Sequence, residues 1–226
     1  GEVFLNNSGI LSNLDINMGE AIINEICSVN YELISDVLIE SNGNKWICSD
    51  SGLMMTNADN LNKINKLEGF QAKNVSRIFK DQEGSIWILS KQNGLYSYHG
   101  DALKYLEFSR NQRFTPSSFV KNDIGQLFIS YFGKGIDIFD GQIVKKIDAN
   151  NGLTSNYIRS MSVYEDSYWF VGARGVTVLK GNSYNSYTTS SGLPHNYCFY
   201  TCIDSKGRTW VGTEGGVAVF ENNSFH

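Results

Sequence analysis

The sequence predicts an all-β fold, a β-propeller of four-stranded antiparallel blades, and three observations support this prediction. A short apolar pattern with a large residue at its centre recurs six times, the intervals between copies are almost constant, and Gly, Asn and Asp turn signals separate the apolar runs. The first interval is 42 residues and the next four are 41, measured between the anchors Phe4, Trp46, Trp87, Phe128, Trp169 and Trp210. Because loops tolerate insertions, a spacing this regular indicates that each unit packs against copies of itself.

Composition and charge narrow the classes of function. The 226 residues are 13% aromatic, contain two prolines and carry a net charge of −4 without any Lys/Arg run. This balance argues against a nucleic-acid partner and against adhesion to an anionic membrane surface. No apolar stretch approaches the roughly 18–20 residues that cross a bilayer, so we expect no direct membrane insertion. The chain opens on Gly1, without Met or a signal-peptide pattern, which favours a piece of a longer protein.

The cysteines do not predict a disulfide or a metal site. They are Cys27, Cys48, Cys198 and Cys202. The last two lie four apart in a strand-like run, so their Cα atoms would be roughly 13 Å apart, too far for a disulfide. No C-x-x-C or Cys/His ligand spacing occurs. We therefore expect four small buried thiols, no metal and no cofactor.

Each repeat has local reasons for its turns. The clearest copy runs from Ile203 to Phe220, with Asp-x-x-Gly before the anchor and a second Gly after it. Asp hydrogen-bonds its own following backbone and Gly supplies a positive φ, so the pair reverses the chain. Further turns follow the third strand, which gives four antiparallel strands in each period. A β-sandwich does not explain five successive intervals of 41 or 42 residues. The turn acids Asp81, Asp166 and Asp204 are expected to be structural.

A second pattern, Gly-Leu-x-x-Asn, precedes two of the predicted innermost strands. It occupies residues 151–158 and 191–197, and a weaker version occupies 68–75. We expect these crossing loops to run from the outermost strand of one blade to the innermost strand of the next. In a propeller they gather on one face, around the mouth of the central channel.

Together, Gly-Leu-x-Ser-Asn, Asp-x-x-Gly-x-x-Trp-x-Gly-Thr and the following Gly-(Leu/Val) resemble the two-component regulator propeller repeat. The resemblance covers essentially the whole chain and is best in the last two copies. Phe128 replaces Trp in the fourth copy, and the second and fourth copies lack a recognisable crossing loop. WD-repeat propellers share the period, but their Gly-His and Trp-Asp dipeptides are missing.

The resemblance implies a function. Propellers of this family form the extracytoplasmic sensor region of bacterial hybrid two-component regulators, usually in tandem arrays before a membrane helix and a histidine kinase. Carbohydrates are their usual signals. The resemblance therefore implies a periplasmic or extracellular location and an oligosaccharide ligand. It also implies further propeller and kinase domains of a parent protein as partners.

The strand count predicts five blades with an innermost strand and one partial blade. Phe4 lies in a second strand, and residues 224–226 only begin an outermost strand. We treat residues 1–226 as a single β-propeller. It is either a fragment of a larger propeller or a six-bladed ring with one imperfect blade. In both cases the terminal sheets have open edges, which could pair two copies into a homo-oligomer.

Polar and aromatic residues at the channel mouth are the predicted ligand-binding set. Asn and Arg pair with sugar hydroxyls, and an aromatic face stacks on C–H surfaces. Turn capping is the alternative role for the repeated asparagines, charge balance for the arginines and interblade packing for Tyr200. The candidates are Lys73, Asn74, Arg77, Asn156, Tyr157, Arg159, His195, Asn196 and Tyr200.

The sequence favours a non-catalytic, ligand-sensing module. One alternative is a protein-interaction or dimerisation scaffold, and a second is a propeller lyase of the streptogramin-lyase type. A lyase would need a His general base and a metal-binding acidic cluster. Of the three histidines, His99 falls in an outer turn and His226 ends the chain, which leaves His195 without a placed partner. We therefore assign no catalytic residue.

Overall fold

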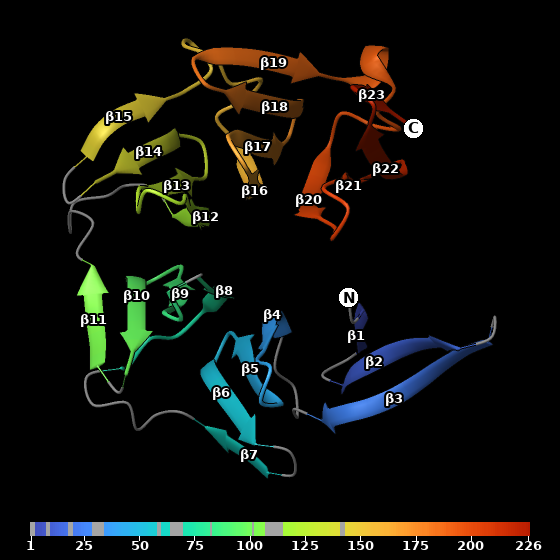
Figure 1. Ribbon diagram of the computed structural model, residues 1–226. Helices are drawn as coiled ribbons and strands as arrows, with labels where there is room; N and C mark the ends of the chain where they lie inside the picture. The colour runs from blue at the N-terminus through green and yellow to red at the C-terminus, as the bar shows by residue number, and fades with distance from the viewer. Residues whose placement is uncertain are drawn as a thin grey trace. The chain divides into compact units, whose positions relative to one another are not determined.

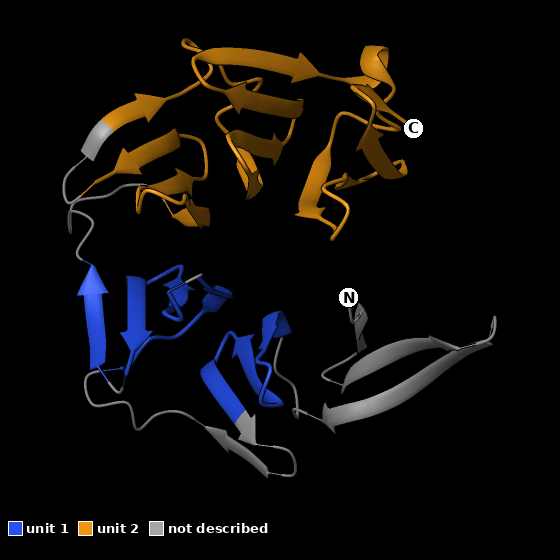
Figure 2. Cartoon of the chain, in the orientation of Figure 1, with its two compact units in different colours: residues 1–111 blue, residues 112–226 orange. Residues whose placement is uncertain are grey.

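The computed structural model describes residues 3–7, 10–17, 20–28, 34–57, 60–63, 70–81, 83–100, 102–106, 115–140 and 143–226. The start of the weaker crossing loop (68–69), the turn residues Asp101 and Gly141, and the side chains of Phe4 and Cys27 lie outside the described residues. The chain divides into two compact units, residues 1–111 and 112–226, each described by itself (Figure 2). The prediction of a single propeller domain stays a prediction.

The first unit contains one three-stranded and two four-stranded antiparallel sheets (Figure 1). The three-stranded sheet comprises β1 (Val3–Asn7), β2 (Ile10–Asn17) and β3 (Glu20–Ser28). The next comprises β4 (Ile34–Ile39), β5 (Asn44–Ser49), β6 (Gly52–Asn57) and β7 (Asn60–Lys63). The last comprises β8 (Val75–Lys80), β9 (Ile86–Ser90), β10 (Gly94–His99) and β11 (Ala102–Leu106).

The second unit contains three four-stranded antiparallel sheets. The first comprises β12 (Pro116–Lys121), β13 (Leu127–Tyr131), β14 (Gly135–Phe139) and β15 (Ile143–Ile147). The second comprises β16 (Ile158–Tyr164), β17 (Ser167–Gly172), β18 (Gly175–Lys180) and β19 (Ser183–Tyr187). The third comprises β20 (Cys198–Ile203), β21 (Thr209–Thr213), β22 (Gly216–Glu221) and β23 (Ser224–Phe225). One short 3₁₀ turn, Thr189–Ser191, precedes β20. No helix in the described part of the chain is long and apolar enough to span a membrane.

These sheets confirm the predicted fold class, because they are five four-stranded antiparallel blades of a β-propeller. Trp46, Trp87, Phe128, Trp169 and Trp210 each lie in the second strand of a blade. Phe4 lies in β1, at the edge of the three-stranded sheet. At the other end β23 is only two residues long. The count of five blades and a partial one is therefore confirmed.

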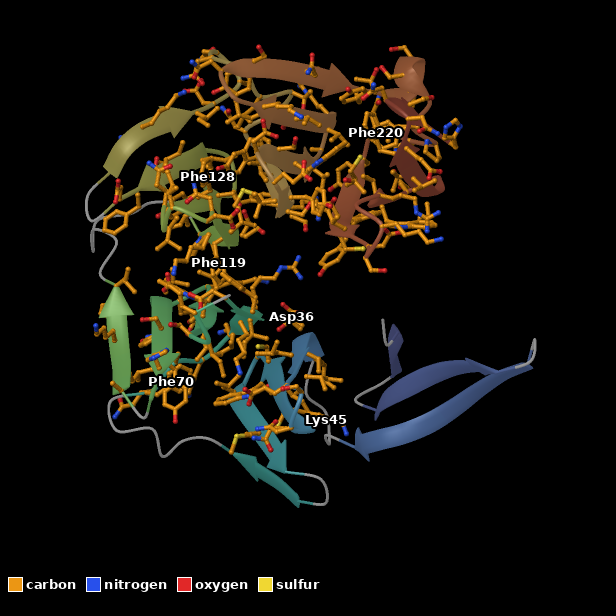
Figure 3. All side chains as sticks on the ribbon, viewed as in Figure 1. Asp36, Lys45, Phe70, Phe119, Phe128 and Phe220 are labelled. Atoms are coloured by element: carbon orange, nitrogen blue, oxygen red, sulfur yellow. The ribbon has the colours of Figure 1, made fainter. Side chains whose placement is uncertain are left out.

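Within each unit, aromatic and aliphatic side chains fill the space between neighbouring blades, as predicted. The ring of Phe220, which is labelled in Figure 3, meets that of Trp169 edge-on, with ring centroids 4.9 Å apart. Trp46 packs on Tyr98 with ring centroids 5.8 Å apart. The Leu of each Gly-Leu-x-x-Asn loop is also buried here: Leu153 joins one interblade core and Leu193 the next. Burying these loop residues anchors the crossing connections to the core.

The turn acids also accept hydrogen bonds from the indole rings of the anchors, a role that the sequence did not predict. The indole Nε1 of Trp210 donates to Asp204 Oδ2 at 3.0 Å, and that of Trp46 donates to Glu40 Oε2 at 2.9 Å. Where Phe128 lacks this donor, the matching Asn122 side chain instead donates to the Tyr168 hydroxyl of the next blade at 2.9 Å. The acid six residues before an anchor therefore holds the ring as well as the turn.

Asp166 departs from the pattern, although it lies in the predicted turn. The turn between β16 and β17 contains only Glu165 and Asp166, because Tyr164 pairs directly with Ser167. Asp166 lies three residues before Trp169, and its carboxylate is 3.3 Å from Lys180 Nζ in an exposed ion pair. A two-residue hairpin of this kind needs positive φ, which Glu165 adopts at 51°.

The thiols differ from the prediction at one position. Cys48 and Cys198 are buried and free, as expected, and burial raises the pKa of Cys198 to about 11. Cys202 is exposed, so the expectation of buried thiols is wrong for this residue. The reason is the alternation along β20, which turns Thr201 to the core and Cys202 away from it.

Candidate functional site

The innermost strand of every described four-stranded blade contains a β-bulge at the same place. The register with the second strand shifts at residues 34/36, 75/77, 116/118, 158/160 and 198/200. In three blades the extra residue is serine, and in two of these its hydroxyl bonds a carbonyl of the next blade: Ser35 Oγ donates to Val75 O at 2.5 Å and Ser117 Oγ to Ile158 O at 2.7 Å. In the last two blades the extra residue is Arg159 (in β16) and Phe199 (in β20), respectively. A bulge changes the direction of its extra side chain. The last two blades therefore have a cation and an aromatic ring at the position where the other three have a small hydroxyl side chain.

Just before these bulges, each crossing loop is held by its own asparagine. Asn156 Oδ1 accepts the Ala149 N–H at 2.7 Å, and Asn196 Oδ1 accepts the Thr189 N–H at 2.8 Å. The two loops therefore close in the same way. Turn capping, the alternative role considered for both residues, accounts for their side-chain oxygens.

The asparagine carbonyls fasten the crossing loops to the preceding blades. Asn156 O accepts the Gly135 N–H at 3.2 Å, and Asn196 O accepts the Gly175 N–H at 2.6 Å. Both glycines have positive φ, and a Cβ on Gly175 would lie 2.2 Å from Tyr187 O. The turn glycine is thus required for this close approach.

Arg159 lies among aromatic rings contributed by the two neighbouring blades of the second unit. Its guanidinium carbon is 4.5 Å from the Tyr197 ring centroid, 5.6 Å from Phe199 and 6.0 Å from Phe132. Its Nη2 donates to the Tyr197 hydroxyl, whereas Nε is buried without a hydrogen-bond partner among the described residues. Phe132 also meets Tyr157 edge-on at 5.0 Å. We call these five residues the Arg159 cluster.

The outer surface of the Arg159 cluster is open to solvent. Phe132 and Tyr157 are each 47% exposed, and Phe199 is 43% exposed. A hollow of about 360 Å³ adjoins Tyr157 and is lined mainly by the crossing loop, with Arg174 at its side. Exposed aromatic rings beside a concave surface are typical of a ligand site.

His195 has the geometry of a loop cap. Its Nδ1 accepts the Tyr197 N–H at 3.0 Å, just as Ser155 Oγ accepts the Tyr157 N–H at 3.1 Å in the preceding loop. The same ring nitrogen lies 3.3 Å from Glu214 Oε2, where it would donate when protonated. Since one nitrogen cannot accept and donate at once, only one of these two contacts is a hydrogen bond in a given tautomer of the ring.

The three candidates in the first unit lie around the start of β8. Lys73 O accepts from Ser90 Oγ at 2.6 Å, and the Asn74 N–H donates to Asp50 O at 2.8 Å. Burial raises the pKa of Asp36, and the nearby positive charge of Arg77 opposes that rise. Charge balance, the alternative weighed for Arg77, therefore describes its surroundings better than an open ligand contact.

The structure brings only part of the predicted set together. Tyr157 and Arg159 lie in the cluster, Asn156, His195 and Asn196 support its loops, and Tyr200 follows it on β20 with 47% of its surface exposed. Sequence reasoning missed Phe132, Tyr197 and Phe199. Aligning the two Asn-Tyr loops would have found two of them, because Tyr197 then matches Tyr157 and Phe199 matches Arg159.

A second hollow, of about 370 Å³, lies at the turns between strands of the last two blades. Tyr164, Trp169 and Arg208 contribute to its lining. Arg208 is already engaged, because its Nε donates to Asp204 Oδ2 at 2.7 Å. Among the residues that the structure describes, no group of three or more His, Cys, Asp or Glu side chains could hold a metal ion.

Comparison with known proteins gives a family match for one copy of the repeat. Residues 192–215 match the two component regulator propeller family. They comprise the last crossing loop, β20, β21 and the turn acid Asp204, so the match falls where the sequence resemblance was best. No curated protein matches the chain.

Solved structures share the fold at low sequence identity. The extracellular domain of the hybrid two component system BT3049 from B. thetaiotaomicron superposes with a TM-score of 0.74 and 18% identity, covering 99% of this chain and 34% of that one. Virginiamycin B lyase from Staphylococcus aureus gives 0.73 and 13%, covering 100% and 80%. The WD40 β-propeller domain of Doa1 gives 0.75 and 14%, covering 99% and 77%. The chain therefore spans about a third of the length of the two component relative.

Proposed function

Because the chain carries a two component regulator propeller repeat, we propose that it is a non-catalytic sensing module of a signal-transduction receptor. Its ligand is a carbohydrate-derived signal that binds at the crossing-loop end of the blades. The parent protein would hold this module outside the cytoplasm, in the periplasm or extracellular space, and pass the signal to a histidine kinase. The extracellular address of the BT3049 relative supports this placement.

The observation that carries the proposal is the Arg159 cluster. Two exposed rings, Phe132 and Phe199, lie against the Arg159 guanidinium, and a third, Tyr157, packs on Phe132 at the end of the blades where the crossing loops gather. Flat rings stack on the C–H faces of sugars, and guanidinium donors suit hydroxyl or carboxylate oxygens. The asparagine caps hold the crossing loops that contain Tyr157 and Tyr197 before a ligand arrives, which lowers the entropic cost of binding.

A propeller lyase is the second candidate, favoured by the likeness to virginiamycin B lyase. Such an enzyme would use His195 as its general base. The geometry supports this role poorly, because the Nδ1 lone pair already accepts the Tyr197 N–H. A binding scaffold without a small ligand is the third possibility, and the experiment below separates the three.

The test is a thermal-shift screen of the full chain against a panel of neutral and acidic oligosaccharides. A sensing module should melt at a higher temperature with at least one of them, since a ligand that binds only the folded state stabilises it. Tyr157→Ala should abolish the shift, whereas Tyr105→Ala, which removes an equally exposed tyrosine from β11, should preserve it. No shift across the panel would overturn the proposal. Turnover of a streptogramin that is lost on chelation or in His195→Ala would favour the lyase instead.

A further inference from the structure

Arg159 is a cation without a counter-charge. No carboxylate in the described part of the chain forms an ion pair with it, whereas Arg208 is paired with Asp204 and Lys134 with Asp137. The rings around it supply cation–π attraction, which is weaker than a charge-assisted hydrogen bond to a buried carboxylate. The site therefore has positive charge that the described residues leave unneutralised.

The guanidinium also has an incompletely used pair of donors. Nε–H and one Nη–H point along the same edge and together match the two oxygens of a carboxylate. In this structure Nη2 donates to the Tyr197 hydroxyl, a neutral acceptor, and Nε has no partner among the described residues. Leaving a buried donor of a charged group unsatisfied costs free energy that an anionic acceptor would recover.

The rings define what kind of anion fits. Phe132, beside the guanidinium, meets Tyr157 edge-on, and both residues remain about half exposed to solvent. A small inorganic anion would leave these faces bare, whereas a pyranose ring would cover them. The combination of an open aromatic surface and a planar donor pair fits a sugar ring bearing a carboxylate.

We infer that the Arg159 cluster is the subsite for a uronic acid residue of the saccharide signal. This inference rests on the proposed sensing function and names the chemical class of its ligand. The carboxylate takes the paired donors of Arg159 when the Tyr197 hydroxyl turns aside, and the sugar ring lies against Tyr157 and Phe132. No covalent step is involved.

The experiment measures the Kd of the full chain by calorimetry for short galacturonate, glucuronate and mannuronate oligomers, each beside its methyl ester. The ester keeps the ring and removes the charge. At least one acid oligomer should bind about tenfold or more tightly than its ester. Arg159→Met should remove this preference. Lys180→Met, which removes an exposed cation from the far end of β18, should leave it unchanged.

Two further variants keep the test valid if Arg159→Met fails to fold. Arg159→Lys retains the charge without the planar donor pair and should weaken acid binding about tenfold, with circular dichroism as the check on folding. Tyr197→Phe keeps the ring and removes the competing hydroxyl, so it should bind the acid oligomer more tightly and the ester equally. Undiminished acid binding in Arg159→Lys, or weaker acid binding in Tyr197→Phe, would contradict the inference.

The outcomes separate this inference from the proposed function. If esters and neutral sugars bind as tightly as the acids, the uronate assignment fails while the sensing function stands. If no oligosaccharide of any charge binds, both fail.

Discussion

The indole Nε1 of Trp87 donates a hydrogen bond of 2.7 Å to Oδ2 of Asp81, six residues earlier in the chain. The other oxygen of the same carboxylate accepts the Ser85 N–H at 2.8 Å. One acid therefore closes the turn and fixes the buried anchor at once. This explains why the acid, the Gly and the Trp recur at a fixed spacing.

Removing the indole donor should destabilise the blade. Trp87→Phe loses a hydrogen bond to a charged group and part of a buried ring, so we expect the free energy of unfolding to fall by about 1–3 kcal/mol. Urea denaturation followed by far-UV circular dichroism measures this. In a double-mutant cycle with Asp81→Asn, the two changes should be coupled by more than about 0.5 kcal/mol, and strict additivity would contradict the account.

Low pH should destabilise the last blade, because it protonates the Asp204 carboxylate. The Trp210 indole hydrogen bond, above all, together with Arg208, lowers the pKa of Asp204 below the ordinary value of 3.8 despite partial desolvation. A carboxyl with a lowered pKa in the folded state adds stability that is complete above its unfolded pKa and is lost as pH falls further. Wild type should therefore be more stable than Asp204→Asn at pH 7, and the difference should shrink below about pH 4. Urea denaturation midpoints of both proteins, measured across this pH range, test the prediction. A difference between wild type and Asp204→Asn that grows as the pH falls would refute it.

Two equivalent glycines should respond differently to alanine. Gly175 and Gly216 each open the third strand of a blade at positive φ, 103° and 125°. A Cβ on Gly175 would lie 2.2 Å from Tyr187 O, whereas nothing lies within 4 Å of a Cβ on Gly216. Gly175→Ala should therefore cost about 2 kcal/mol or more beyond Gly216→Ala, because it adds a clash to the shared backbone strain. Equal losses of stability for the two variants in thermal denaturation would show that the close approach of Gly175 to Tyr187 O does not determine the cost of the substitution.

The cap at Asn196 should depend on its oxygen and not on its amide. Asn196→Ala removes the acceptor of the Thr189 N–H and should lower the free energy of unfolding by about 1 kcal/mol. Asn196→Asp keeps an acceptor and should restore most of that loss. If Asp proves as damaging as Ala, the side-chain amide has a role beyond capping, and its contribution to ligand binding should then be measured.

Much of this fold could be predicted from the sequence, because the anchor spacing and the turn residues report strand order directly. Trp46 and Trp210 are anchors of the regular spacing, and both lie in the second strands of their blades. The site was harder to predict. Phe132 enters it from a hairpin of another blade, and Phe199 reaches it through a bulge, which no periodic pattern signals. Asn156 and His195 looked like ligand contacts because capping atoms and ligand atoms belong to the same residue types.

The most direct test of ligand binding at the crossing-loop end is hydrogen exchange with mass spectrometry. The full chain would be compared with and without the oligosaccharide that raises its melting temperature most. We predict slower exchange in the crossing loops and bulges of residues 148–159 and 188–199, with no change in the turns at 204–209 and 221–224. Protection confined to those turns, or absent from both crossing loops, would contradict the account.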